Sequence, residues 1–170
     1  MRVRIARKAD ITAIAALIAH YAAEEILLPR DEPDIRKHLG VFLVLAESEE
    51  VIGCVSLEGY HPRLAEIRSL AVNPDSRGRG LGARLIKAAL DLAERRNISR
   101  VFALTSKPAF FLRHGFTLSS RFALHEKIDR DCIHCPKART CRLAAVTMDL
   151  ASEHEAFSVL EDSSSLIPVE

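Results

Sequence analysis

The chain has 170 residues, 48% of them hydrophobic, and its 24 Lys and Arg residues balance 23 Asp and Glu residues to a formal charge of +1. This length is enough for one domain with a core of its own, and the balanced charge argues against nucleic acid as the main partner, which usually requires a clustered basic excess. The sequence contains no apolar run as long as a membrane span, and its N-terminus leads into a strand pattern instead of a signal peptide. We therefore expect a cytoplasmic protein that does not act on membranes.

The first half of the sequence predicts two helices and four strands. Asp10 is expected to cap a helix whose apolar positions recur at helical spacing over residues 11–21. Asp31 is expected to begin a shorter helix that Gly40 ends. Two β-rich runs flank the acidic turn at residues 47–50 and predict an antiparallel hairpin. The predicted strands are residues 3–5, 41–46, 51–57 and 65–72.

The second half predicts a parallel crossover unit followed by closing strands. Strand, glycine loop, helix and a second, strongly apolar strand follow one another, which is the order of such a unit. The predicted elements are a helix at 81–97, strands at 100–105, 116–118 and 142–150, and a short helix at 108–113 that Gly115 ends. Residues 151–170 are expected to form a mobile or loosely docked tail.

A glycine loop lies between the strand at 65–72 and the helix that begins at Leu81. Its Arg-x-x-Gly-x-Gly motif is carried by Arg77, Gly80 and Gly82. The glycines let the backbone turn without Cβ clashes and expose successive N–H groups to one anion, and the helix adds its unsatisfied first-turn N–H groups. A P-loop would need Lys and then Ser or Thr after the last glycine, and a dinucleotide fingerprint would need two residues between its second and third glycines. Neither nucleotide motif fits, and the loop predicts a diphosphate ligand.

This loop, directly after a Leu-Ala-Val strand end, resembles the coenzyme A pyrophosphate loop of the GCN5-related N-acetyltransferases (the GNAT family). The resemblance covers about residues 1–150 and implies an α+β (α/β) acetyltransferase domain whose mixed, mostly antiparallel twisted sheet of six to seven strands is flanked by helices. It also implies acetyl-CoA as co-substrate, lying between splayed strands on either side of the crossover helix. Backbone groups of Leu70 and Val72 would bond the pantetheine arm, and the N–H of Ala71 or Val72 would stabilise the oxyanion. The diphosphate would be held by Arg77, Gly78, Arg79, Gly80, Leu81, Gly82 and Ala83.

Glu66 is the candidate general base for acetyl transfer, which needs a neutral amine, an oxyanion donor and a proton for the departing thiolate. It lies two residues before Arg68 and four before Leu70, so the three side chains are expected to share one face of the strand. Some family members place the base at the equivalent position, and a structural pairing with Arg68 is an equal alternative. Many relatives protonate the thiolate with a tyrosine, but this chain has phenylalanines at 110–111, so the thiolate would leave unprotonated or take its proton from water. His114 is expected to be a surface residue.

Three further stretches narrow the resemblance, at residues 25–30, 65–72 and 102–107. They are similar to the amino-acid N-acetyltransferases that convert L-glutamate to N-acetylglutamate at the entry to arginine biosynthesis. This implies a stand-alone catalytic domain in which the amine attacks the thioester directly. Because guanidinium groups bind carboxylates bidentately, we expect Arg30, Lys107 and Arg68 to bind the substrate. The alternatives are a GNAT enzyme for another amine (a protein N-terminus, a polyamine or an antibiotic) and a non-catalytic acyl-CoA sensor.

One short loop near the C-terminal end of the domain contains three cysteines. The spacing of Cys132 and Cys135 suits half of a zinc site, with Cys141 as third ligand and His134 or His125 as fourth. Zinc or another metal and free or redox-active thiols are the main alternatives, ahead of a disulfide. The loop could stiffen the acceptor pocket or take part in a homodimer.

Overall fold

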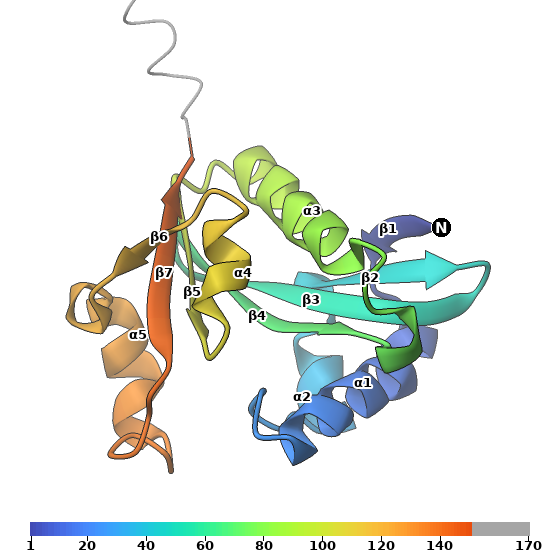
Figure 1. Ribbon diagram of the computed structural model, residues 1–170, viewed down its shortest axis with the longest axis horizontal. Coiled ribbons are helices and arrows are strands. Elements are labelled where there is room, and N and C mark those ends of the chain that lie inside the picture. Colours follow the sequence, from blue (N-terminus) through green and yellow to red (C-terminus); the bar gives the residue numbers. More distant parts are fainter. Residues whose placement is uncertain (151–170) are drawn as a thin grey trace, which may run out of the picture.

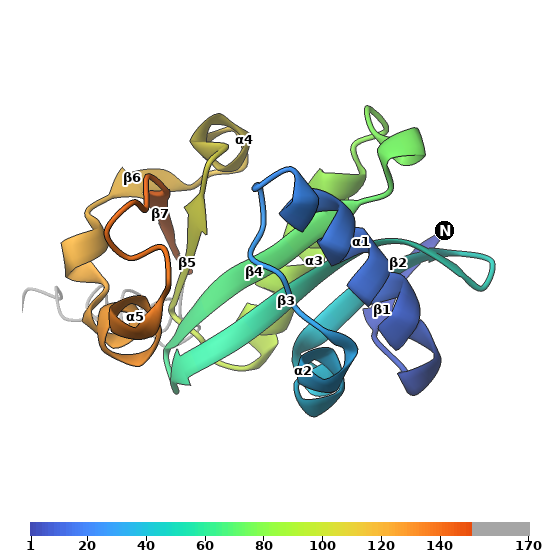
Figure 2. The ribbon, with the colours of Figure 1, turned by 90° about the horizontal axis from the view of Figure 1, so that it is seen from below.

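The central feature of the computed structural model is a twisted seven-stranded sheet with helices on both faces (Figure 1, Figure 2). The strands lie in the order β1-β2-β3-β4-β5-β7-β6, and neighbours are antiparallel except for β4 and β5, which are parallel. Their bounds are β1 Arg2–Ile5, β2 Phe42–Glu47, β3 Glu50–His61, β4 Leu64–Val72, β5 Arg100–Thr105, β6 Thr117–Ser119 and β7 Ala144–Asp149. The structure describes residues 1–150, so the predicted tail at 151–170 lies outside the described residues. The predicted α+β fold with a mixed, mostly antiparallel sheet is confirmed.

Two groups of helices give the core two layers. Helix α3 covers one face of the sheet, whereas α1 and α2 cover the other (Figure 1). The α-helices are α1 Ile11–Ala23, α2 Glu32–Lys37, α3 Leu81–Arg95, α4 Pro108–Leu112 and α5 His125–Arg130, and the 3-10 helices are η1 Lys8–Asp10, η2 Leu39–Val41, η3 Pro74–Ser76, η4 Arg121–Ala123 and η5 Cys132–His134. No helix within residues 1–150 has both the length and the apolar character needed to cross a lipid bilayer.

The predicted helix ends are partly wrong. Asp31 caps α2 as expected, because its carboxylate accepts the N–H of Asp34 at 2.9 Å. Asp10 precedes α1, but its side chain makes no capping bond to that helix. It accepts instead from the Arg4 guanidinium at 2.6 and 3.0 Å and from the Arg7 N–H. Helix α2 ends at Lys37, before Gly40, since the chain continues there as η2.

The parallel crossover unit is confirmed, but one region of the second half was missed. Residues 64–66 of β4 pair in parallel with residues 100–102 of β5, and α3 connects the two strands. No element is predicted for residues 121–134, which form η4, α5 and η5. The apolar positions there are too few to show a helical period, and the residues that this region contributes to the site were missed with it.

A β-bulge in β4 changes which side chains share a face. Val55 of β3 lies opposite both Ser69 and Leu70, and Ser69 has a positive φ of 52°. Beyond the bulge Leu70 packs into the core on the α3 side, as Ile67 does. The prediction that Glu66, Arg68 and Leu70 share one face is therefore wrong for Leu70.

Candidate active site

The sheet opens between its two parallel strands. Residues 64–66 of β4 pair with β5, after which β4 continues beside β3 to Val72 and β5 continues beside β7 to Thr105. Figure 2 shows the two strands diverging from their paired ends. The facing edges over residues 67–72 and 103–105 are not paired with each other, so their backbone groups can bond an extended ligand placed between them.

The glycine loop borders a cavity of about 400 Å³ at one end of this opening. Gly78 and Gly80 have φ values of +77° and +69°, which only glycine adopts without strain. Helix α3 begins at Leu81, and its first-turn N–H groups have no partners within the helix. The cavity is lined by Val72, Ser76, Arg77, Gly78, Gly80, Leu81, Gly82, Ala83, Phe110, Arg113 and His114. Its walls therefore combine backbone donors, the positive end of a fifteen-residue helix and two arginines, which suits a diphosphate.

Arg77 is held at the edge of this cavity by Tyr21 of α1. Its guanidinium carbon lies 5.0 Å from the centre of the Tyr21 ring, and its Nε donates to the Tyr21 hydroxyl at 3.0 Å. The hydroxyl in turn donates to the carbonyl of Val72. This chain of contacts links α1 to the coenzyme loop. Arg79 lies outside the cavity, 3.7 Å from Glu47.

Replacing Gly82 with valine is expected to weaken coenzyme A binding at least about tenfold, equivalent to about 1.4 kcal/mol. A Cβ atom at Gly82 would already lie 3.1 Å from Phe110 Cζ, and the branched side chain would enter the cavity. Isothermal titration calorimetry with coenzyme A measures the effect, and thermal melting checks the fold. Gly40→Val is the matched control, because a Cβ there meets no atom within 4 Å. Equal affinities for the two variants would contradict the placement of the diphosphate.

Six charged side chains form a cluster on the face of the sheet that α1 and α2 cover. We call it the charged cluster, and its members are Arg30, Glu58, Glu66, Arg68, Lys127 and Asp131. Glu58 accepts from the Arg30 guanidinium and, at 3.3 Å, from Arg68 Nη1. Lys127 Nζ donates to Glu66 at 2.9 Å and to Asp131 at 2.8 Å. The Tyr60 hydroxyl lies 2.7 Å from both of these carboxylates and can donate to one of them at a time.

Two carboxylates of this cluster, those of Glu58 and Asp131, are held ionised by their neighbours. Burial alone would raise the pKa of Glu58, but Arg68 and Arg30 hold it below its ordinary value. Burial likewise opposes ionisation of Asp131, yet hydrogen bonds from Arg130, Lys127 and Tyr60 lower the pKa of that carboxyl strongly. The Glu58 and Asp131 carboxylates are thus negative at neutral pH.

A cavity of about 140 Å³ joins the charged cluster to the open end of the sheet, and we call it the acceptor cavity. Its polar walls include Arg30, Glu66, Arg68, Lys127 and Asp131. The remaining lining residues are Ile26, Leu27, Leu28, Ile67, Ser69, Cys132, Cys135 and Cys141 together with Leu104 and Leu143. Since β4 and β5 both contribute to it beyond their last paired residues, the cavity opens onto the gap between these strands.

Glu66 presents one free oxygen to this cavity. The contacts from Lys127 and Tyr60 all reach Oε2, and Oε1 has no hydrogen-bond partner among residues 1–150. Within the same range, Arg4 Nε is the one side-chain nitrogen or oxygen that is fully buried and has no hydrogen-bond partner. Because Glu66 Oε1 also has no partner but is not in this class, it is not fully buried. Although the residue is 3% exposed, this oxygen can accept a proton from a group in the cavity.

Arg30 and Arg68 each have one guanidinium nitrogen that is free to donate to a ligand. Their Nη2 atoms donate to no acceptor in the described part of the chain, and neither is fully buried and unpaired. The structure thus brings two of the three predicted substrate-binding cations together. Lys107 lies elsewhere, exposed at the start of α4 and outside the lining of the acceptor cavity.

Four residues of the site are not among those predicted from the sequence: Glu58, Tyr60, Lys127 and Asp131. The first two extend β3 beyond the predicted end at residue 57, where polar residues at every second position were a usable signal. Lys127 and Asp131 are four residues apart at α5, which gave no periodic signal. His114, expected at the surface, is half-buried beside the diphosphate cavity, with Nδ1 2.7 Å from the carbonyl oxygen of Phe110.

The three thiols of the cysteine loop are free and half-buried. Cys132, Cys135 and Cys141 line both the acceptor cavity and an adjoining cavity of about 180 Å³. In the part of the chain that the structure describes, no three Cys, His, Asp or Glu side chains are grouped so that they could hold a metal ion. His125 and His134 are both exposed. The predicted zinc or other metal site is therefore not found, because its ligands do not converge.

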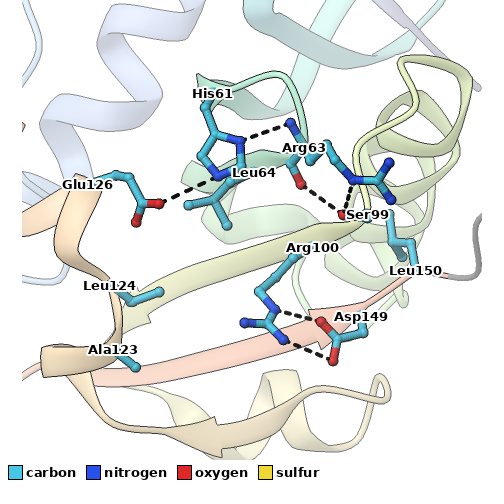
Figure 3. Close-up of a pocket in the computed structure, with 10 residues that line it drawn as sticks. All are labelled: His61, Arg63, Leu64, Ser99, Arg100, Ala123, Leu124, Glu126, Asp149 and Leu150. Atoms are coloured by element: carbon cyan, nitrogen blue, oxygen red, sulfur yellow. Dashed lines mark hydrogen bonds and ion pairs between the residues drawn. The ribbon is translucent and has the colours of Figure 1, made fainter.

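A larger cavity, of about 590 Å³, lies where β4 and β5 begin (Figure 3). Its polar side chains contact one another: Arg100 pairs with Asp149 at 2.6 Å, His61 lies 3.5 Å from Glu126, and Arg63 donates to Ser99 at 3.1 Å. It contains none of the predicted site residues, and its lining includes the first residues of both strands, which lie before the gap. The chemistry of the site therefore lies at the other end of these strands.

Residues 10–116 match the acetyltransferase (GNAT) family model, and the chain belongs to this family. It is 38% identical to an uncharacterised N-acetyltransferase of Chlorobaculum tepidum, over 87% of this chain and 96% of that protein. It is 36% identical to the amino-acid acetyltransferase of Mycobacterium tuberculosis, over 68% of this chain and 67% of that protein. The protein is thus an acetyl-CoA-dependent N-acetyltransferase of the GNAT type.

Solved structures extend the comparison to bound ligands. A crystal structure of an M. tuberculosis protein in complex with coenzyme A aligns with a TM-score of 0.76 and 28% identity, over 89% of this chain and all of that one. The N-acetylglutamate synthase of Neisseria gonorrhoeae, crystallised with coenzyme A and N-acetyl-glutamate, aligns with a TM-score of 0.78 and 28% identity. The match covers 88% of this chain and 35% of that longer protein.

Proposed function

We propose that the protein transfers the acetyl group of acetyl-CoA to the α-amine of an acidic amino acid, most favourably L-glutamate. The observation that carries the proposal is the acceptor cavity, where Arg30 and Arg68 keep free guanidinium donors beside the free oxygen of Glu66. Two carboxylates and one amine are the groups that such walls bind. The similarity to an amino-acid acetyltransferase and to an N-acetylglutamate synthase supports the same acceptor. With this acceptor, we assign the protein to arginine biosynthesis in the cytoplasm.

The coenzyme is assigned to the gap and the glycine loop. In this proposal Arg77 to Ala83, Arg79 included, hold the diphosphate, and backbone groups of Leu70 and Val72 bond the pantetheine arm. The N–H of Ala71 or Val72 then stabilises the oxyanion that forms on the thioester carbonyl. The bulge at Ser69 supports this, because it interrupts the regular pairing of β4 at the point where a ligand would need free backbone groups.

Glu66 is assigned the role of general base. Its Oε1 takes a proton from the substrate ammonium, directly or through one water, and the neutral amine attacks the carbonyl carbon. The C–N bond forms, the attacking nitrogen loses its second proton to water, and the tetrahedral intermediate collapses as the C–S bond breaks to release the coenzyme A thiolate. Phe110 and Phe111 cannot supply a proton, so the thiolate is protonated by water.

Two alternatives differ in the acceptor. A cationic amine such as a polyamine would be attracted by Glu58, Glu66 and Asp131, but each of these carboxylates already accepts from an Arg or Lys of the charged cluster. A protein N-terminus would need an open groove, whereas the acceptor cavity measures about 140 Å³ and Lys137 of its cysteine loop reaches Glu25 of the facing loop at 3.3 Å. Both observations favour a small acidic acceptor. Lys107 remains a predicted substrate ligand for which the cavity gives no support.

The acceptor is tested by chromatographic measurement of coenzyme A release over a panel of amino acids, polyamines and peptides, for the wild type and Arg30→Ala. We expect glutamate to have the highest kcat/KM, and Arg30→Ala to raise the glutamate KM more than about tenfold while the acetyl-CoA KM stays within about twofold. Turnover with polyamines or peptides but with no amino acid would support one of the alternative acceptors. Coenzyme binding with no turnover at all would support a sensor.

A homodimer also remains a prediction. Three large apolar side chains, Leu118, Phe122 and Ile133, are 64%, 78% and 62% exposed around β6 and the cysteine loop. β6 is an edge strand of the described sheet, so this is the region where a second copy would pack.

A further inference from the structure

The thiols of the cysteine loop occupy an unusual position, because they belong to the wall of a charged cavity. Cys132, Cys135 and Cys141 all line the acceptor cavity, and none of them is fully buried. The fourth cysteine differs: Cys54 is fully buried in β3, where burial raises the pKa of its thiol to about 12. The protein therefore has three thiols that a small molecule in the cavity can reach and one that it cannot.

Cys132 and Cys135 have the backbone geometry that a disulfide needs. They stand at the first position of η5 and at its C-terminal cap, and the Cys135 N–H donates to the Cys132 carbonyl at 3.2 Å. Side chains three residues apart eclipse on a 3-10 helix, whose rise of about 2.0 Å per residue places their Cα atoms about 6 Å apart. Disulfides bridge Cα atoms about 4.4–6.8 Å apart, so the turn needs little change to close.

Cys141 is held differently. It follows two turns of the loop, and its carbonyl accepts from Arg121 Nη1 of η4 at 3.3 Å. It is nine residues from Cys132 and six from Cys135, outside the single 3-10 turn that joins those two. Cys141 is therefore a natural control for the other two thiols.

A covalent bond at Cys132 would act directly on the charged cluster. Asp131, the preceding residue, accepts from Lys127 at 2.8 Å and from Tyr60 at 2.7 Å, and it lies 3.6 Å from Arg68. Any rotation of the backbone at the start of η5 changes these contacts, because the Asp131 carboxylate is shared among four partners, the fourth being Arg130 at 3.0 Å.

We propose that Cys132 and Cys135 form a reversible dithiol–disulfide pair in the wall of the acceptor cavity, which reacts with small-molecule disulfides. One cysteine thiolate attacks a sulfur of the small disulfide, so that an S–S bond forms to the protein and one small thiol leaves. The second cysteine attacks this mixed disulfide, the intramolecular S–S bond forms, and the second small thiol leaves. Two electrons pass from the two cysteines to the small disulfide, and the two cysteine protons end on the two released thiols or in solvent.

The bond itself is tested by equilibrating the full chain with mixtures of reduced and oxidised glutathione, blocking the remaining thiols and mapping the peptides by mass spectrometry. We expect a product that has lost two hydrogen atoms and links Cys132 to Cys135. Cys141→Ser is expected to form the same bond, whereas Cys132→Ser and Cys135→Ser stop at a mixed disulfide. A link to Cys141, or no intramolecular link at any ratio, would overturn the pairing.

The effect on the cavity rests on the proposed function and has its own readout. Oxidation is expected to change the glutamate KM at least about threefold with little change in the acetyl-CoA KM, in the wild type and in Cys141→Ser. Comparison of the oxidised and reduced forms within each variant removes any basal effect of the substitution. An identical glutamate KM in both forms would overturn the link to the charged cluster. If glutamate is not a substrate at all, the proposed function fails while the peptide map still decides the thiol pair.

Discussion

Glu66→Gln is expected to lower kcat for acetyl transfer to glutamate about 100-fold at neutral pH, the loss typical when a general base is removed. The amide keeps the size of the side chain and can still accept from Lys127 and Tyr60, but it cannot take a proton from the substrate ammonium. The acetyl-CoA KM is expected to stay unchanged, because Glu66 is not part of the diphosphate cavity. Steady-state kinetics with both substrates varied measures the two effects separately.

Glu58→Gln is the matched control for this experiment. Glu58 belongs to the same charged cluster, but both of its oxygens are already taken by Arg30 and Arg68. If proton transfer is the role of Glu66, kcat should fall much less in Glu58→Gln. Equal losses in the two variants would show that the negative charge matters and that neither carboxylate is the base.

Lys127→Met is expected to lower the free energy of unfolding by about 3 kcal/mol. Lys127 is 6% exposed and its ammonium lies within 3 Å of Glu66 and Asp131, so its removal leaves two carboxylates of the charged cluster without their shared partner. Breaking a buried ion pair from one side costs about 3–5 kcal/mol. Urea denaturation followed by circular dichroism measures the change.

Lys87→Met is the control, since Lys87 also pairs with an aspartate four residues along its helix but is largely exposed. Its loss should stay below about 1 kcal/mol. The double variant Glu66→Gln with Lys127→Met should recover part of the stability, because one uncompensated charge is gone. A Lys127→Met protein as stable as Lys87→Met would mean that water already solvates this cluster.

The coenzyme side of the site was predictable because its signals are local. Gly80 and Gly82 stand between an apolar strand and an amphipathic helix, and the backbone conformation that they permit is dictated by the absence of Cβ. The structure confirms the strand, the crossover and the helix start, and most of the predicted loop residues line one cavity. Arg79 is the exception, because nothing in the spacing tells which arginine of the loop turns inward.

The acceptor side depends on contacts that are distant in the sequence. Glu66 and Lys127 are 61 residues apart, and their pairing follows from how α5 packs against the sheet. The bulge at Ser69 is equally hidden, because a serine at positive φ has no sequence signal of its own. Arg30 was predicted from resemblance, but the sequence alone does not reveal that Glu58 orients it.

The pairing between the two parts of the sheet is short, so a bound coenzyme is expected to raise the protein's free energy of unfolding. Three residue pairs of β4 and β5 join the first four strands to the last three, and a molecule lying beyond them would bridge both parts. A ligand at 100 times its Kd adds about 2.7 kcal/mol to the free energy of unfolding by mass action. Since proteases cleave transiently opened molecules, bound coenzyme A is expected to slow proteolysis of the purified protein.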